Sequence, residues 1–378
     1  MDLFLDDDQV LLRDTLRSYF DKEVAPLVAE HERDRTFPWE ILGPLYDFGF
    51  VRGLVSEEHG GDEISYTTLA AITEEAGRCW GSLRTTLNVL SMVARMLSVA
   101  GTPEQRARFL DPLMRGERFG WVGITEPDAG SDAGAMRTTA KPDGDGYRIS
   151  GNKLYITNAL GCDFGILLAV VPDGGVTAFL VDKDESPYGC HDIPHMPVRS
   201  TTSCELAFDE VYVPAANVIG EIGGGFGLAM AAVNIGRLCM SMGAVGIMQA
   251  CLEASITYTT GRKQFGKPIA GFQLVQEMVV EIATLTETSR LVGYKAAKAL
   301  DAGLPGRFEC SMAKYHCGES VGRAATLALQ VHGGAGLMEE SPVERYFRDA
   351  REATIPEGTT QIQILQMGKH LLGISAMR

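Results

Sequence analysis

Short strand-like segments separated by turn clusters occupy the middle of this chain, and long stretches of helical periodicity lie on either side. The clusters Pro-Asp-Gly-Asp-Gly at 142–146 and Pro-Asp-Gly-Gly at 172–175 are typical of tight turns between neighbouring strands. No helical stretch alternates with the strands, so a parallel nucleotide-binding sheet is disfavoured and a small antiparallel β-domain is predicted. The predicted strands are 138–141, 147–150, 165–171, 177–181, 206–208 and 211–213.

Apolar residues recur at helical spacing both before and after this region. The predicted helices cover 8–31, a short segment beginning at Pro38, 66–78, 83–100, 103–115, 228–260, 272–302, 308–331 and 359–372. The last four are long enough to form a bundle. The order predicts an α+β protein with an N-terminal α-helical domain (1–118), a middle β-domain (119–227) and a C-terminal four-helix bundle (228–378).

The net charge of −15 limits the possible partners. An acidic surface repels phosphate backbones and anionic lipids, so we expect neither a nucleic-acid nor a membrane partner. The apolar run 222–252 contains glycines and Arg237, which favour a buried bundle helix over a membrane span. Residues 1–8 lack a basic region and a long apolar core, which predicts no signal peptide. The eight scattered cysteines contain no C-x-x-C pair, so reduced thiols in a cytoplasm are expected.

Familiar metal and phosphate motifs are incomplete in this sequence. Cys310 and Cys317 have no second ligand pair at zinc spacing, so no metal is predicted. Residues 261–267 satisfy G-x-x-x-x-G-K, but Pro268 stands where a P-loop needs Ser or Thr. The glycines at 333–336 do not complete G-x-G-x-x-G. A dinucleotide would therefore bind by another route.

Four polar or glycine-rich segments remain, and each alone has an ordinary explanation as a loop or a helix end. They are Ile-Thr-Glu-Pro-Asp-Ala-Gly-Ser-Asp at 124–132 with Lys-Leu-Tyr-Ile-Thr-Asn at 153–158, Tyr-Thr-Thr-Gly-Arg-Lys-Gln-Phe-Gly at 258–266 with Gln273, Gln-Val-His-Gly-Gly-Ala-Gly at 330–336, and Ile-Pro-Glu-Gly-Thr-Thr-Gln-Ile-Gln at 355–363. In this order and spacing they resemble the signatures of the acyl-CoA dehydrogenase family. The likeness covers essentially the whole chain, and the α–β–α order is also that family's architecture.

The resemblance implies an FAD cofactor. The residues that match the family's FAD contacts are Thr125, Ser131, Tyr155, Thr157, Arg262, Gln264, Phe265, Gln273, Gln330, Gly333, Gly334, Thr359 and Gln361. Thr125 would hydrogen-bond the flavin ring, and Tyr155, where many relatives carry Trp, would cover it with Thr157. Arg262 and its neighbours match contacts to the FAD of an adjacent subunit, so the resemblance implies a homodimer or homotetramer.

Glu357 matches the family's catalytic base. The α-proton of a thioester is weakly acidic, so its base needs a desolvated position that raises the carboxyl pKa. In the family, the backbone N–H of this residue and a flavin ribose hydroxyl polarise the thioester carbonyl. A hydride then passes from the β-carbon to flavin N5 and leaves a 2,3-enoyl thioester. Pro356 replaces an aromatic residue of the relatives, which leaves the shape of the acyl pocket open.

Arg84 and Asn88 lie one helical turn apart and share a face. Their segment is similar to a Ser-x-x-Arg-Ser run of glutaryl-CoA dehydrogenases, whose Arg reads the distal carboxylate. Arg84 would then meet a carboxylate or hydroxyl at the far end of a short acyl chain, or it is simply a structurally paired or exposed arginine. Ser131, Arg237 and Gly358 complete the substrate-binding set that we expect.

The resemblance leaves several activities open. The first is a dehydrogenase of short acyl-CoA thioesters that hands electrons to an electron-transferring flavoprotein. Some family members in antibiotic pathways instead oxidise a short polar or hydroxylated acyl group on an acyl carrier protein. An oxidase or monooxygenase that uses O₂ and a non-catalytic assembly subunit occur on the same fold. The presence of Glu357 argues against the last of these.

Overall fold

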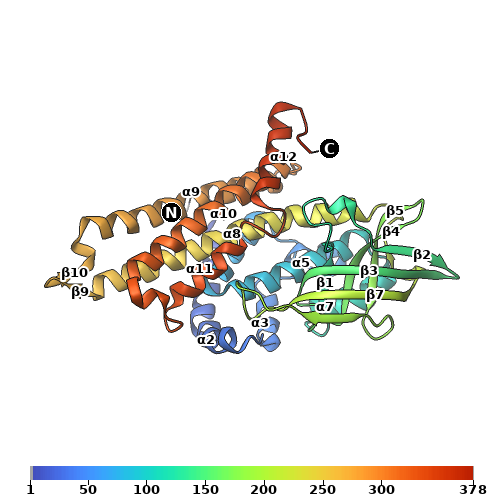
Figure 1. Cartoon of the computed structure of the whole chain (residues 1–378), viewed down its shortest axis with the longest axis horizontal. Helices are drawn as coiled ribbons and strands as arrows, with labels where there is room; N and C mark the ends of the chain where they lie inside the picture. Colours follow the sequence, from blue (N-terminus) through green and yellow to red (C-terminus); the bar gives the residue numbers. More distant parts are fainter. Residues whose placement is uncertain (1–2, 378) are drawn as a thin grey trace.

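A computed structural model describes residues 3–377 as an elongated molecule, with helices along its length and a β-domain at one end (Figure 1). Residues 1–2 and 378 lie outside the described residues, and so does the very start of the N-terminal segment considered above. The predicted fold class is confirmed: helices, then strands, then helices follow one another along the chain.

Helices form the first third of the chain. They are α1 (Asp7–Tyr19), α2 (Ala25–Asp34), α3 (Leu42–Tyr46), α4 (Tyr66–Cys79), α5 (Gly81–Ala100), α6 (Pro103–Gln105) and α7 (Asp111–Met114). The side chains of Asp6 and Gln9 each bond the other's backbone N–H, which caps the start of α1. The predicted helices 8–31 and 103–115 each contain one turn of π-helix, at Phe20–Val24 and Arg106–Leu110.

The middle of the chain forms one eight-stranded sheet. Its strands are β1 (Gly120–Gly123), β2 (Thr139–Asp143), β3 (Gly146–Thr157), β4 (Phe164–Val171), β5 (Gly175–Asp182), β6 (Gly189–Asp192), β7 (Ser203–Pro214) and β8 (Val218–Ile219). The two turn clusters join β2 to β3 and β4 to β5, as predicted. Most pairs are antiparallel, but β1 and β2 both run parallel to β4, because neither reaches it through a tight turn.

The sheet is covered on both faces. Along β4, Phe164, Ile166 and Leu168 are buried with the N-terminal helices, whereas Leu167 and Ala169 face the opposite core. This alternation follows from the two-residue period of a strand. It explains why β4 is apolar at nearly every position.

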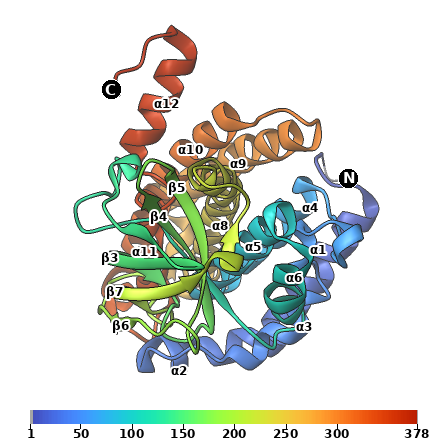
Figure 2. The same ribbon diagram turned by 90° about the vertical axis from the view of Figure 1, so that its right-hand side faces the viewer.

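The last third of the chain is helical. It contains α8 (Gly225–Gly261), α9 (Gln273–Asp301), α10 (Arg307–His332), α11 (Pro342–Glu352) and α12 (Thr360–Leu372), with a small hairpin of β9 (Lys263–Gln264) and β10 (Lys267–Pro268) between α8 and α9. Helix α8 packs against α4, α5, α9 and α10. It is long and apolar enough to cross a membrane, yet 83% of its most apolar window is buried, as in the core helix of a soluble protein. Helix α12 projects from the body (Figures 1 and 2).

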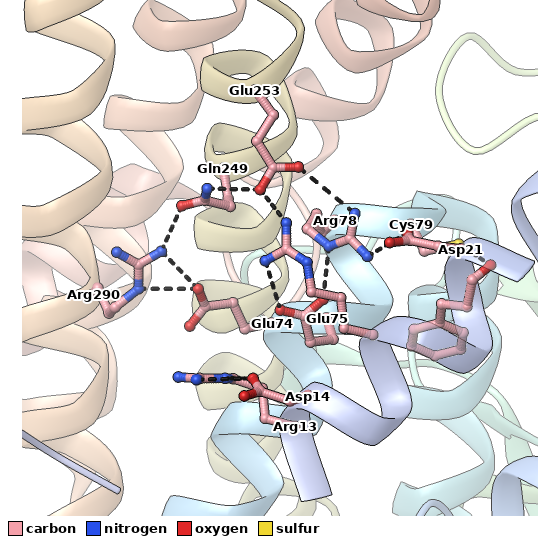
Figure 3. A network of polar contacts seen from close by, with 12 residues as sticks. Arg13, Asp14, Asp21, Glu74, Glu75, Arg78, Cys79, Gln249, Glu253 and Arg290 are labelled. Carbon is pink, nitrogen blue, oxygen red and sulfur yellow. Dashed lines mark hydrogen bonds and ion pairs between the residues drawn. The ribbon is translucent and has the colours of Figure 1, made fainter. Parts of the chain in front are cut away.

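A network of charges, buried at Glu74, Glu75 and Arg78, joins the N-terminal helices to the bundle (Figure 3). Arg78 of α4 bonds Glu75 at 2.6 Å and Asp21 at 2.7 Å, and its third contact is Glu253 of α8 at 3.7 Å. On the other side of α4, Arg290 of α9 bonds buried Glu74 at 2.8 Å. These contacts fix the position of α4, and therefore of the α5 helix that follows it, against α8.

Candidate active site

The turn between α11 and α12 carries Glu357 in a conformation unusual for a non-glycine residue. Its φ is 57° and that of Gly358 is 89°, so both lie in the left-handed region. Arg237 of α8 donates from Nε to the Glu357 carbonyl at 3.0 Å, and Gln363 donates to the carbonyls of Glu357 (3.1 Å) and Gly358 (2.9 Å). A strained backbone held by several side chains is typical of a functional site.

Glu357 is half-buried, and its carboxylate lies between α5 and α8. Asn88 of α5 donates to Oε1 at 3.3 Å. On α8, a Cβ on Gly236 would lie 2.7 Å from the carboxylate, so only glycine leaves room for it there. Burial raises the pKa of Glu357 to about 7, although Arg237, the Asn88 hydrogen bond, Lys314 and Arg84 all act to lower it. A carboxylate in this state is a suitable general base near neutral pH.

Arg84 lies deep in the same region, in a buried ion pair. Its Nη2 contacts Oε2 of Glu352 at 2.5 Å, and its aliphatic stem packs against Gly243. The side chains of Arg84 and Glu352 are 2% and 9% exposed, respectively. Nε and Nη1 of Arg84 have no hydrogen-bond partner among the described residues. The structural pairing considered above is therefore present, but two donors of the guanidinium remain unused.

Arg84 and Asn88 also line one small cavity. Phe50, Leu69 and Leu87 form its apolar wall, and Thr73, Ser91 and Cys239 add polar atoms. Because Asn88 also contacts Glu357, this cavity lies next to the carboxylate. The predicted face of α5 thus brings Arg84, Asn88 and Glu357 together.

The loop at 124–132 is fixed by a second buried ion pair. Glu126 accepts hydrogen bonds from Lys153 Nζ (2.9 Å), Arg137 N (2.6 Å) and Thr138 N (2.9 Å). Thr125, next to this anchor, accepts from Leu154 N with its carbonyl, which ties the loop to β3. Ser131, further along the loop, is exposed.

Strand β3 presents Tyr155 outwards through a bulge. The register with β7 shifts between Lys153 and Ile156, and Tyr155 in this bulge has a φ of 60°. Its ring is 64% exposed, and Thr157 at the end of the strand is partly exposed. Bulges commonly re-aim a side chain next to an active site. An exposed aromatic ring beside the 124–132 loop is a suitable surface for a planar cofactor.

The remaining predicted FAD contacts lie in three places. Arg262, Gln264, Phe265 and Gln273 are exposed on or beside the β9–β10 hairpin, and Gln330, Gly333 and Gly334 are exposed where α10 ends. Figure 1 shows the hairpin at one end of the molecule and the β-domain at the other. Phe265 is 93% exposed. Thr359 and Gln361 lie elsewhere, at the start of α12, where Thr359 Oγ1 accepts from Ile362 N at 3.3 Å.

The chemistry of these residues fits a flavin dinucleotide. Tyr155 offers an aromatic face, Arg262 a charge for phosphate, and the glycines at 333 and 334 are open to close backbone approach. In residues 3–377 no group of three or more His, Cys, Asp and Glu residues could hold a metal ion.

Three residues around Glu357 were not predicted from the sequence. Gly236 makes room for the carboxylate, Gln363 holds the turn, and Lys314 of α10 donates from Nζ to the Gly358 carbonyl at 2.7 Å. A glycine inside an apolar helix is a weak signal, since it costs about 1 kcal/mol relative to alanine and so needs a reason. Lys314 gave no local signal, because a lysine on a helix is ordinarily solvated.

Known proteins resemble this chain over nearly its whole length. The chain matches the family descriptions "Acyl-CoA dehydrogenase, N-terminal domain" over residues 6–117, "middle domain" over 122–211 and "C-terminal domain" over 223–372. It is 33% identical to the short/branched chain specific acyl-CoA dehydrogenase of Rattus norvegicus over 97% of this chain and 86% of that protein. Glutaryl-CoA dehydrogenase of Desulfococcus multivorans is 34% identical over 99% of both chains. A glutaryl-CoA dehydrogenase from Mycobacterium smegmatis, solved with FADH2, superimposes with a TM-score of 0.94 at 26% identity and covers 99% of this chain and 97% of its own.

Proposed function

Because this chain belongs to the acyl-CoA dehydrogenase family, we propose that it oxidises a short acyl thioester to the 2,3-enoyl thioester, with Glu357 as the base. The observation that carries the proposal is the Glu357 carboxylate itself. It is held on a left-handed turn, is directed into the interior beside Asn88 and has a pKa of about 7. A solvated first-turn glutamate would have none of these features.

In the proposed reaction, the protein removes a proton and holds the base in position. The carboxylate removes the α-proton, and the electrons of that C–H bond form the new double bond as the β-hydrogen leaves with its electron pair. When bound, FAD supplies the acceptor for that hydride. Arg237 and Gln363 fix the turn so that the carboxylate stays within reach of the α-carbon, which is the positional part of catalysis.

We propose that Thr125, Ser131, Tyr155 and Thr157 hold the flavin ring end of FAD, and that Thr359 and Gln361 complete the site at the start of α12. Ser131 and the turn at Gly358 would contact substrate as well. The anchored 124–132 loop and the bulge at Tyr155 support this role, since both hold exposed groups in one fixed orientation.

We propose a homo-oligomer, at least a dimer, in which the hairpin residues and those at the end of α10 contact the FAD of a neighbouring subunit. Within one chain, the hairpin and the β-domain lie at opposite ends of the bundle (Figure 1). Phe265 and Leu274 on this end are 93% and 74% exposed, and Leu371, Leu372 and Ile374 around the end of α12 are also exposed. Apolar side chains exposed in this way are expected to be covered in an assembly.

For the acyl group, we propose a short chain whose far end approaches Arg84. The unused Nε and Nη1 donors favour a hydrogen-bond acceptor such as a hydroxyl or a carboxylate. Glu352 already balances one positive charge there, which reduces the preference for a second carboxylate. A cytoplasmic enzyme using an electron-transferring flavoprotein as its acceptor fits the family.

The proposal is tested by adding a panel of thioesters to the oxidised holoenzyme without oxygen. The panel varies the far end of the acyl chain and the carrier of the thioester. It contains butyryl-, isobutyryl- and glutaryl-CoA, together with glyceryl groups on CoA and on an acyl carrier protein. Bleaching of the flavin absorbance by at least one thioester is the expected result. If only a hydroxylated or dicarboxylic acyl group bleaches it, Arg84 has the role proposed above. A flavin that is bound but reduced by none of the thioesters would contradict the proposed activity.

The rate should depend on pH through Glu357. Only the ionised carboxylate accepts a proton, so kcat/KM is expected to fall as the pH is lowered through about 7, the pKa of Glu357. Because burial raises this pKa, between the ordinary value of 4.5 and about 7 the native state holds a proton that the unfolded chain has lost, so the contribution of Glu357 to stability falls as the pH rises through this window. A pH profile of kcat/KM at saturating acceptor checks this. An acid limb near pH 4.5, the ordinary carboxyl pKa, would show that Glu357 is not desolvated.

A further inference from the structure

A buried lysine lies directly behind the catalytic turn. The side chain of Lys314 on α10 is fully buried, and its Nζ donates to the Gly358 carbonyl at 2.7 Å. Lys153, the other fully buried lysine, forms an ion pair with Glu126 at 2.9 Å. Lys314 has no such ion pair among the residues that the structure describes. A buried ammonium without an adjacent carboxylate destabilises the fold, because its lost hydration is not replaced by an ion pair. A lysine in such a position is therefore a candidate for a role in function.

Two of the three carboxylates around Lys314 are hydrogen-bonded or ion-paired to other residues. Glu319, on the same helix, accepts from the Thr360 hydroxyl at 2.7 Å, and Glu352 of α11 pairs with Arg84 at 2.5 Å. Glu357, by contrast, receives one long hydrogen bond from Asn88 at its carboxylate. Glu357 is also the largest favourable charge acting on Lys314, whose pKa burial lowers to about 8. The Glu357 carboxylate is therefore the largest opposite charge acting on Lys314, and for Glu357 itself Lys314 is the second cation after Arg237.

Lys314 also belongs to a set of three donors that hold the turn from three helices. Arg237 of α8 holds the carbonyl of Glu357, Gln363 of α12 holds those of both Glu357 and Gly358, and Lys314 of α10 holds that of Gly358. The left-handed backbone of Glu357 costs energy in free peptide, whereas Gly358 adopts its own without a Cβ clash, so these hydrogen bonds keep Glu357 in a conformation that it would otherwise leave. Lys314 is the one lysine in the set, and its charge is fully enclosed.

We propose that Lys314 is a positioning residue for the catalytic base: its hydrogen bond fixes the Glu357–Gly358 turn, and its enclosed charge acts together with Arg237 to favour the ionised form of the Glu357 carboxylate. This inference rests on the proposed function of Glu357. It adds that two opposing effects set the pKa of the base. Burial raises this pKa, and the enclosed cation limits the rise. The other groups that face Glu357 are Arg237 and Cys239 on α8, and Arg84 and Asn88 on α5.

The test compares two holoenzyme variants on the turn. Lys314→Met removes the charge and the hydrogen bond, whereas Gln363→Leu removes two neutral hydrogen bonds and no charge. We expect Lys314→Met to move the acid limb of kcat/KM upward by about one pH unit or more, as for loss of a neighbouring cation. We expect Gln363→Leu to lower kcat and leave the acid limb where it is in the wild type. KM should change little in either variant, because neither side chain reaches the substrate.

A spectroscopic readout does not depend on turnover. The carbonyl stretch of protonated Glu357, identified as the band that disappears in Glu357→Gln, should titrate at higher pH in Lys314→Met than in the wild type. An acid limb and an infrared titration unchanged in Lys314→Met would overturn the inference. So would equal shifts in both variants, because the charge would then be irrelevant. If the Met variant does not fold, Lys314→Gln makes the same test, since it also removes the charge but keeps an amide donor. Flavin reduction that survives in Glu357→Gln would instead contradict the proposed function.

Discussion

Replacing Glu357 by glutamine is expected to slow anaerobic reduction of the flavin by the best thioester about 10³-fold or more, at the upper end of the effect of a general base. Glutamine has nearly the same shape, and its amide can keep the contact with Asn88 and the fit against Gly236. It cannot accept a proton. FAD content and substrate affinity should therefore remain close to those of the wild type while the chemical step is lost. Stopped-flow absorbance of the flavin measures this directly.

Glu319→Gln is the matched control for this variant. Glu319 lies on α10 near the same turn, is exposed, and contacts Thr360. The substitution is again glutamate to glutamine, but it leaves the catalytic base Glu357 in place. The rate of flavin reduction should therefore stay near that of the wild type. If the Glu357 variant is reduced within tenfold of the wild-type rate, another group removes the proton.

Replacing Arg78 by methionine is expected to destabilise the fold by about 3–5 kcal/mol, the usual result of removing one partner from a buried ion pair. Arg78 is 9% exposed and Glu75 is 3% exposed, so the glutamate would be left with a buried and poorly balanced charge (Figure 3). The partial contact from Arg17 to Glu75 at 3.7 Å does not replace a 2.6 Å ion pair. Denaturant unfolding followed by circular dichroism gives the free-energy difference.

Arg33→Met provides the comparison for Arg78→Met. Arg33 forms an ion pair with Asp34 on the surface, where the two side chains are 65% and 51% exposed. Solvent screens an exposed pair, which therefore contributes little to stability, so this variant should unfold at nearly the wild-type denaturant concentration. Similar losses in both variants would mean that the network at α4 carries no particular stability.

Local patterns predicted most of the elements, and long-range pairing explains the differences. The turn clusters at 142–146 and 172–175 identified two hairpins because Pro-Asp-Gly chemistry determines a turn locally. The predicted strands 206–208 and 211–213 form one strand, β7, because Glu210 adopts a φ of 51° and lets a bulged strand continue. Helix α11 was not predicted, although Ser341 and Pro342 are a suitable helix start. The parallel pairing of β1 and β2 with β4 joins segments that are distant in the sequence. The periodicity of a single segment carries no information about such pairing.

The candidate site shows the same division. Glu357, Arg84 and Asn88 were predicted from a family resemblance and from helical spacing, and the structure brings them together. Lys314 and Gly236 were missed because their roles exist only across helix contacts, 43 and 121 residues from Glu357 in the sequence. A lysine and a helical glycine have many uses, and only the packed structure shows which one applies.

Helix α8 has a further consequence for how chains of this kind can vary in length. Its 37 residues form one unbroken helix of about 55 Å, with Arg237 near the beginning and the hairpin directly after the end. One residue inserted between them would turn the hairpin by about 100° around the helix axis and move it about 1.5 Å away. The base would keep its support while the hairpin faced a different direction. Insertions and deletions should therefore be confined to loops such as 183–188, between β5 and β6, and the number of residues in α8 should remain fixed.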